Sequence, residues 1–170
     1  MFDPNDCIVV IQTYPDGQAQ TDIWGCLYAK GIPMENVNFV NMRDVIVARN
    51  FAVQHYILPS GKNTALLLDN DVRPGLAGTE RFWDADGDIV GAYAPMGSLA
   101  LHINGAVHCG MMRVNTDIFK ALSPPWFDFV RTPDGCGTIE CECSYFTQRA
   151  RAAGYSVVQA GYCGHGEHAY

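Results

Sequence analysis

Short apolar runs alternate with amphipathic stretches over the first seventy residues of the chain. The runs at residues 7–13, 37–40 and 66–68 are rich in β-branched or aliphatic side chains, which is typical of buried strands. Residues 19–30 and 43–58 carry apolar side chains at helical spacing, and each stretch stops at a glycine or proline. This alternation predicts parallel strands joined by right-handed helical crossovers.

The second half of the chain has a different pattern. Residues 88–93, 99–103 and 107–114 read as strands with short connections, which favours antiparallel pairing. The remaining expected elements are short helices near 76–83 and 115–122, a longer helix over 139–153 and a last strand at 156–160. We therefore predict one α/β domain with helices on both faces of a mixed sheet, parallel in its N-terminal half and partly antiparallel in its C-terminal half.

Composition supports a globular protein and narrows its partners. The 170 residues are 48% hydrophobic and 17% charged, which allows a substantial core. No apolar run reaches the length of a membrane span, and the first residues are acidic, so we expect a soluble, cytoplasmic protein. The net charge of -7, without a basic block, argues against broad binding to a nucleic-acid backbone. A nucleobase held locally as a substrate is still compatible with this charge.

Two carboxylates stand at the end of the third apolar run. Asp69 and Asp71 flank Asn70 at the point where open α/β sheets bind ligands. Residues two apart on an extended chain share a face, so both carboxylates could reach one hard divalent cation. The alternative is an ordinary turn, because this triplet precedes Pro74 and Gly75.

The seven cysteines are unevenly distributed, and their pattern leaves two interpretations open. Three lie in apolar settings and are expected to be small buried hydrophobes: Cys7, Cys26 and Cys109. The others gather near the C-terminus with two histidines: Cys136, Cys141, Cys143, Cys163, His165 and His168. That group could form a structural zinc site, or its thiols could simply be reduced and mostly buried.

Several motifs along the chain share one order with a known family. They are a Thr-containing turn after the first strand (Thr13, Tyr14), the triplet Ala48-Arg49-Asn50, Asp69-Asn70-Asp71, a Gly-containing segment over 109–113, Pro125-Trp126-Phe127, an acidic segment before a helix (Glu140, Glu142), the run 149–155 ending in Ala-Gly-Tyr, and Gly164-His165-Gly166. Together they resemble a GT-A glycosyltransferase, over nearly the whole chain. Members of this family use nucleotide sugars and have a Rossmann-like mixed sheet.

The resemblance implies a metal and nucleotide site. Asp69, Asp71 and His165 would hold Mn²⁺ or Mg²⁺, and His168 competes with His165 for this role. Neutral imidazole suits Mn²⁺ better than Mg²⁺. Further residues are implied to bind the nucleotide sugar: Thr13 and Tyr14 at the base and ribose, Asn70 beside the metal ligands, and Arg49 at the diphosphate. Alternatively, Arg49 is an arginine at the solvent end of an amphipathic helix, and Tyr14 is a buried aromatic.

The resemblance is weaker at the acceptor side. The family's Glu-Asp pair falls on Glu142 and Cys143, so a cysteine replaces the usual aspartate. The catalytic base that takes the acceptor proton is left open between Glu142 and Glu140. Either carboxylate could instead only stabilise the start of a helix. Trp126 and Phe127 are expected to form an apolar platform for the acceptor, or a hydrophobic plug.

These features lead to one functional hypothesis with two alternatives. The hypothesis is a metal-dependent glycosyltransferase that moves a sugar from a UDP- or GDP-sugar to an acceptor hydroxyl on a glycan, a protein or a modified nucleobase. Residues 1–75 would be the nucleotide-binding half and residues 76–170 the acceptor and catalytic half. The compact chain is similar to phage or viral enzymes, which would place it in a host cytoplasm. The alternatives are a nucleotidyltransferase of similar fold and a non-enzymatic zinc-binding interaction module.

Overall fold

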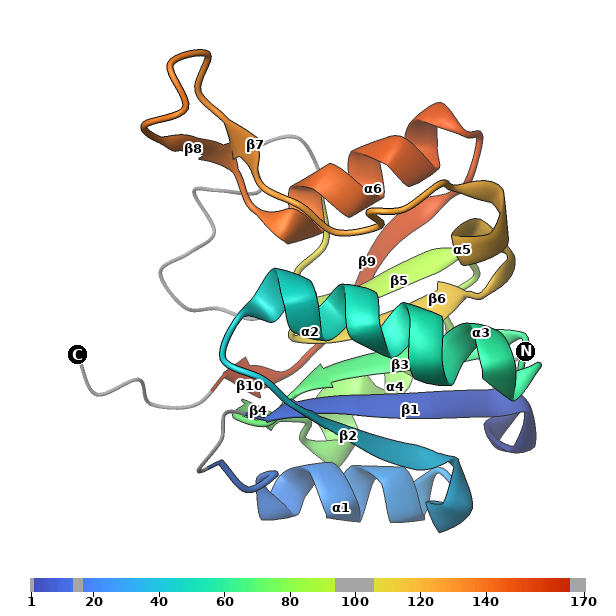
Figure 1. The fold of residues 1–170 in the computed structure, drawn as a ribbon. Coiled ribbons are helices and arrows are strands. Elements are labelled where there is room, and N and C mark those ends of the chain that lie inside the picture. The colour runs from blue at the N-terminus through green and yellow to red at the C-terminus, as the bar shows by residue number, and fades with distance from the viewer. Residues whose placement is uncertain (1, 14–16, 94–105, 166–170) are drawn as a thin grey trace.

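Six strands form one twisted sheet in the centre of the molecule, with α2 (Val45–Ala52) and α3 (Leu58–Ser60) in front of it and α4 (Leu76–Asp84) behind it in the view of Figure 1. The computed structural model describes residues 2–13, 17–93 and 106–165. Across the sheet the strands follow the order β2 (Val37–Asn41), β1 (Cys7–Thr13), β3 (Thr64–Asp69), β6 (Met111–Asn115), β5 (Ile89–Tyr93) and β9 (Val157–Tyr162). Both halves of the chain therefore contribute three strands to a single sheet.

Strand directions follow from the connections between the strands. β1 pairs in parallel with both β2 and β3, and β5 pairs in parallel with β9. β6 runs antiparallel to both of its neighbours, β3 and β5. The predicted α/β class is thus confirmed: the sheet is mixed, and its N-terminal half is wholly parallel.

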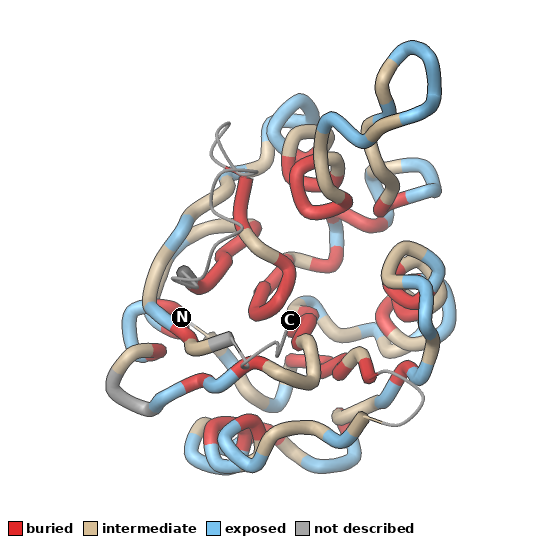
Figure 2. The backbone as a smooth tube through the Cα atoms, turned by 90° about the vertical axis from the view of Figure 1, so that its left-hand side faces the viewer, coloured by how far each residue is buried: buried red, intermediate tan, exposed pale blue. Residues whose placement is uncertain are grey.

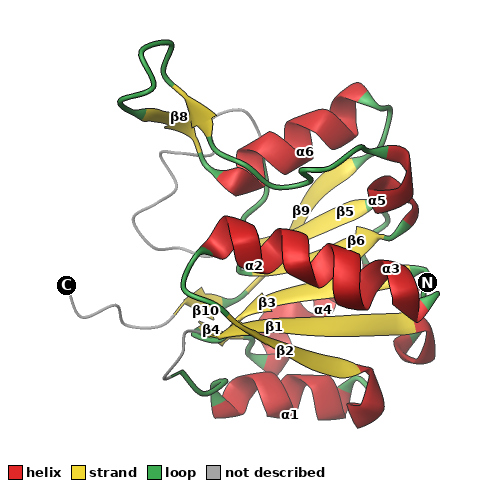
Figure 3. Ribbon diagram, viewed as in Figure 1, coloured by secondary structure: helices red, strands yellow, loops and turns green. Residues whose placement is uncertain are grey.

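Helices cover both faces of this sheet (Figure 3). One face carries α1 (Thr21–Ala29) and α4 (Leu76–Asp84). The other carries α2 (Val45–Ala52), its continuation through the π-helical turn η3 (Val53–Ile57) into α3 (Leu58–Ser60), α5 (Asp117–Ala121) and α6 (Glu142–Ala152). The smaller elements are η1 (Pro4–Asp6), η2 (Met34–Asn36), the pair β4 (Val72–Arg73) with β10 (Gly164–His165), and the hairpin β7 (Val130–Arg131) with β8 (Thr138–Glu140). Within the described part of the chain, no helix has the length and apolar character needed to cross a membrane.

Alternation along the central strands divides the core into two layers. Val10 and Leu67 pack under α2, whereas Val9 and Leu66 pack against α1 on the opposite face. Both faces of these strands are therefore covered, which explains why β1 and β3 read as continuous apolar runs. The buried segments lie at the centre of Figure 2, and the hairpin that contains β7 and β8 carries exposed residues at its tip.

Two expected elements differ from the structure, and a third is not tested by it. The strand expected over 107–114 begins only at Met111, because Cys109 and Gly110 form a turn in which the Gly110 amide donates to His108 Nδ1 at 2.8 Å. The helix expected from 139 begins at Glu142, because residues 138–140 pair instead with 130–131 in a hairpin. The strand expected over 99–103 lies outside the described residues.

Candidate functional site

Three parallel strands end at one edge of the sheet, and two predicted site residues, Thr13 and Asp69, stand there. Thr13, Asn41 and Asp69 are the last residues of β1, β2 and β3. The antiparallel β6 starts at this same edge, and the Asp69 amide donates to the carbonyl of Gly110 just before it at 2.9 Å. The carboxyl ends of parallel strands are the usual ligand-binding edge of an α/β sheet.

Hydrogen bonds hold the Asp69-Asn70-Asp71 segment in place. The Asn70 amide donates to the carbonyl of Gln12 at 3.0 Å, and the Asn70 carbonyl accepts from the amide of Gln20 at 3.0 Å. The Asn70 side chain also donates to the carbonyl of Gln18 at 3.4 Å. The segment is therefore a turn, as the alternative interpretation required, and this turn fixes the backbone of both aspartates beside the end of β1.

The chain's C-terminal segment returns to the aspartate turn. In the short pair β4–β10, His165 lies opposite Val72 and Gly164 lies opposite Arg73. The backbone of His165 is thereby placed beside the residue that follows Asp71, as a shared metal site would require. The His165 side chain, Tyr14 and His168 lie outside the part of the chain that the structure describes.

Arg49 is the central cation of this edge. Its Nη2 lies 3.0 Å from Asp69 Oδ1, its Nε lies 3.6 Å from Glu142 Oε1, and its Nη1 donates to the carbonyl of Cys109 at 3.4 Å. Burial alone would lower the pKa of this guanidinium, but the charges of Asp69 and Glu142 raise it above its ordinary value. Arg49 therefore remains charged and links the end of β3 to the start of α6.

This geometry corrects the expectation for Arg49. The side chain is only 4% exposed, so it is not an arginine at the solvent end of a helix. The carboxylates of Asp69 and Glu142 occupy its guanidinium group. A diphosphate would have to displace these partners to form the expected bidentate contact. Among the described residues, Nε has no hydrogen-bond partner. Arg49 contacts both carboxylates, and its contact with a diphosphate stays a prediction.

The two candidate bases have different surroundings. Glu142 is buried in the first turn of α6 and faces Arg49. Glu140 ends β8 and accepts hydrogen bonds from Ser144 at 2.8 Å and from Gln148, both on α6. Glu140 thus stabilises the helix that follows it, whereas Glu142 belongs to the group containing Asp69 and Arg49.

Trp126 and Phe127 are part of the core. Trp126 is 6% exposed and Phe127 is fully buried, with its ring 4.6 Å from that of Phe146. Asn50, next to Arg49 on α2, accepts from the amides of Trp126 and Phe127 at 2.9 and 3.2 Å and donates to the Phe127 carbonyl at 2.8 Å. The expected acceptor platform is therefore wrong, because these rings cannot reach a sugar; the hydrophobic plug describes them.

We expect Asn50→Ala to lower the free energy of unfolding by about 2–3 kcal/mol, because it removes the partners of three backbone groups near Phe127. Urea unfolding followed by circular dichroism measures this change. Asn38→Ala, which removes one local hydrogen bond of 3.3 Å, is the matched control and should cost less than about 1 kcal/mol. Equal losses in the two variants would contradict this role for Asn50.

A hollow of about 430 Å³ opens beside the ends of β1 and β2. It is lined by Thr13, Gly17, Gln18, Ala19, Trp24, Phe39 and Asn41. The rings of Trp24 and Phe39 lie 5.7 Å apart and give the hollow an aromatic wall. Of these residues only Thr13 was predicted from the sequence. Trp24, Phe39 and Asn41 were not, because the exposure that places Phe39 at the hollow is decided by the tertiary structure.

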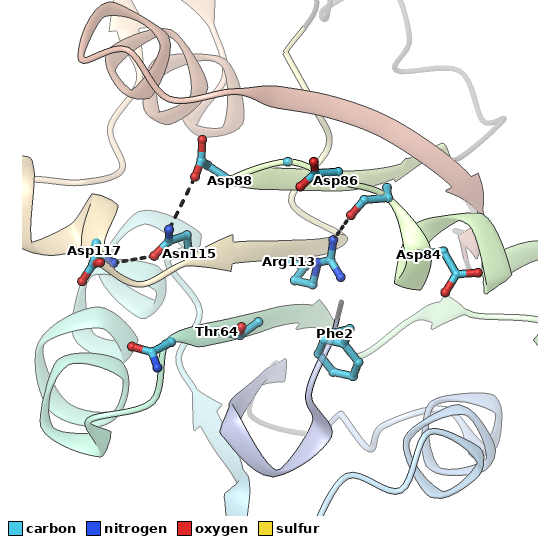
Figure 4. Close-up of a pocket in the computed structure, with 11 residues that line it drawn as sticks. Phe2, Thr64, Asp84, Asp86, Asp88, Arg113, Asn115 and Asp117 are labelled. Carbon is cyan, nitrogen blue, oxygen red and sulfur yellow. Dashed lines mark hydrogen bonds between the residues drawn. The ribbon is translucent and has the colours of Figure 1, made fainter.

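A second hollow, of about 520 Å³, lies at the opposite edge of the sheet (Figure 4). Its lining includes Asp84, Asp86, Asp88 and Asp117, which would repel a diphosphate. Asp88 accepts from the amide and hydroxyl of Ser156 at 2.9 and 2.7 Å, so this carboxylate is already hydrogen-bonded within the fold. We therefore place the candidate site at the Asp69 edge, not in this hollow.

The C-terminal cysteines do not gather as the zinc interpretation required. Cys136 is exposed in the loop between β7 and β8, and Cys163 is buried, with its pKa raised to about 12 by burial and then by the charge of Asp69. Cys141 and Cys143 instead lie beside Glu142. A side-chain hydrogen bond with Cys109 and burial hold the pKa of Cys143 well above its ordinary value. The expected set of four cysteines is therefore divided among separate places in the fold.

Comparisons with known proteins identify the fold. No protein-family model matches the chain, and no curated protein matches its sequence. A197 from the virus STIV is similar in structure, with a TM-score of 0.56 and 14% identity, over 94% of this chain and 82% of A197. A predicted nucleotide-diphospho-sugar transferase from Desulfovibrio desulfuricans G20 is similar with a TM-score of 0.52 and 11% identity, over 91% of this chain and 79% of its own. The fold therefore resembles that of a nucleotide-diphospho-sugar transferase.

Proposed function

We propose that the protein is a metal-dependent glycosyltransferase that moves a sugar from a nucleoside-diphosphate donor to an acceptor hydroxyl. The observation that carries the proposal is the meeting of Asp69 and Glu142, from distant parts of the chain, on the buried cation Arg49. This meeting takes place at the ligand-binding edge of a fold similar to that of a nucleotide-diphospho-sugar transferase.

The aromatic hollow supports a nucleoside at the same edge. Trp24 and Phe39 offer apolar faces to a base, and Thr13 lies between that wall and the aspartate turn. A nucleoside in this hollow would direct its diphosphate toward Asp69 and Asp71, because the turn adjoins the end of β1. The same placement would suit a UDP- or GDP-sugar.

The residues present fit a divalent cation such as Mn²⁺ or Mg²⁺. Asp69 and Asp71 supply hard oxygen donors, and the segment of His165 is hydrogen-bonded directly beside them. An ion held there would offset the negative charge that develops on the departing diphosphate. Arg49 would hold the Asp69 carboxylate in place, because its Nη2 lies 3.0 Å from Asp69 Oδ1.

Glu142 is the residue that we assign as the base. Its carboxylate would take the proton of the acceptor hydroxyl as the acceptor oxygen bonds to the sugar carbon and the nucleoside diphosphate leaves. Arg49 Nε lies 3.6 Å from this carboxylate and positions it at the start of α6. Glu140 accepts hydrogen bonds from Ser144 and Gln148 on α6, so we assign it to stabilising that helix.

Binding of the donor tests the proposal directly. We expect UDP- or GDP-sugars with Mn²⁺ to raise the melting temperature of the wild-type protein by roughly 5–10 °C at about 100 times the dissociation constant. Asp71→Asn should remove the Mn²⁺-dependent part of this shift, because it deletes one of the proposed metal ligands. A thermal-shift panel of nucleotide sugars with and without Mn²⁺ provides the measurement.

Asp86→Asn is the matched control, since it neutralises a carboxylate in the hollow at the opposite edge of the sheet. This variant should keep the full shift. A wild-type protein that responds to no nucleotide sugar, or an Asp71→Asn protein that responds as strongly as the wild type, would contradict the proposed function.

A further inference from the structure

Two thiols flank the carboxylate of Glu142. Cys141 caps the N-terminus of α6, and Cys143 stands in its first turn. The two sulfur atoms and a Glu142 oxygen all lie within 4.8 Å of one another. Cys143 is buried, whereas Cys141 is partly exposed.

We infer that Cys141, Cys143 and Glu142 form a binding site for a thiophilic divalent ion such as Zn²⁺ or Cd²⁺. In a tetrahedral site with Zn–S bonds of ~2.3 Å, neighbouring sulfur ligands are roughly 3.8 Å apart. The three atoms, within 4.8 Å of one another, need to close by about 1 Å at most to reach this arrangement. Two thiolates and one carboxylate leave a fourth position for water, as in many zinc sites with three protein ligands.

The backbone around the site orients its sulfur ligands. The amide of Cys109 donates to Cys143 Sγ at 3.3 Å and thereby fixes the position of this sulfur. The N-terminus of α6 also favours anionic groups in its first turn. Both contacts come from the backbone, so they would remain in any variant that changes only the side chains of the site.

The nearby charge of Arg49 does not oppose this ion. Each thiol loses a proton when it binds a metal, so a divalent ion replaces two protons and the net charge of the group stays the same. Arg49 is also already paired with Asp69 at 3.0 Å. The site therefore differs in chemistry from the aspartate turn, where hard oxygen donors suit Mn²⁺ or Mg²⁺.

The inferred site has a consequence that rests on the proposed function. An ion bound to the Glu142 carboxylate would occupy the oxygen that is needed to take the acceptor proton. Zn²⁺ should therefore inhibit transfer reversibly, and a chelator should restore it. Binding of the ion itself does not depend on this consequence and can be measured without any nucleotide sugar.

Cadmium titration of the full chain tests the site. Under a non-chelating reductant, we expect wild-type protein to bind one Cd²⁺ per chain with the ultraviolet charge-transfer absorption of cadmium thiolates, and Zn²⁺ to compete. Cys141→Ser and Cys143→Ser should each weaken binding by more than the roughly 10–100-fold that loss of an outer-shell partner costs. Cys136→Ser, at the exposed thiol of the preceding hairpin, should bind as the wild type does.

One further variant and a folding control make the outcome specific. Asp71→Asn should retain Cd²⁺ binding even where it loses Mn²⁺-dependent donor binding, so failure of this inference and failure of the proposed function give different results. Because Cys143 is buried, circular dichroism must show that its variant is folded; the partly exposed Cys141 provides the second test. The inference would be overturned if the wild-type protein shows no such absorption, if Cys141→Ser retains it, or if Cys136→Ser loses it.

Discussion

Glu142→Gln is expected to slow sugar transfer by about 10²–10⁴-fold, which is the usual contribution of a general base. Donor binding should change little, because the substitution leaves Asp69, Asp71 and the aromatic hollow intact. The amide keeps the shape of the side chain but cannot take a proton from the acceptor. Steady-state transfer rates, together with thermal shifts by the donor, separate the loss of chemistry from a loss of binding.

Glu140→Gln is the control for this prediction. It removes a similar carboxylate two residues away, where Ser144 and Gln148 are hydrogen-bonded to it. We expect a small loss of stability and a transfer rate within about threefold of wild type, since the base is untouched. If Glu140→Gln abolishes transfer and Glu142→Gln does not, the base has been assigned to the wrong residue.

Arg49→Met should lower the free energy of unfolding by about 3 kcal/mol. Methionine fills a similar space, but it leaves the Asp69 and Glu142 carboxylates facing each other without their shared cation, and breaking a buried ion pair is costly. Asp69 retains some exposure to solvent, which keeps the loss at the lower end of the range for such pairs. Urea unfolding of wild-type and variant proteins gives the difference.

A double variant and a surface variant identify the cause of this loss. Adding Asp69→Asn to Arg49→Met should recover about 1 kcal/mol or more, because it removes one of the uncompensated charges. Lys120→Met breaks the exposed pair with Asp117, of 2.8 Å, and should cost less than about 0.5 kcal/mol. A loss in Arg49→Met no larger than that in Lys120→Met would show that the buried cation is not needed for stability.

Much of the fold could be predicted from local sequence patterns. The apolar runs of β1 and β3 are buried on both faces, so they stand out clearly from the amphipathic helices between them. The hairpin of β7 and β8 could not be predicted, because its short strands have little apolar content and Ile139 is exposed. The pair β4–β10 was missed for a related reason: two-residue strands carry no periodic signal.

The candidate site was only partly predictable. Asp69 and Asp71 could be found because they follow an apolar run, whereas Glu142 was indicated only by the family resemblance, with Glu140 as the alternative. The exposure of a side chain cannot be found in this way. Trp126 and Phe127 have the composition of an acceptor platform, yet the hydrogen bonds of Asn50 hold their backbone against the core. Burial of this loop depends on α2, more than seventy residues earlier.

The sequence by itself determined the alternation of strands and helices, and with it the edge of the sheet where Asp69 and Asp71 stand, because periodicity and turn residues act locally. Only the tertiary structure decided that Arg49 is buried between Asp69 and Glu142, that Trp24 and Phe39 border one hollow, and that Cys141 and Cys143 flank the assigned base within a packed environment. The physical reason is that these contacts join residues on different elements. Their distances depend on strand order and on packing of helices against the sheet.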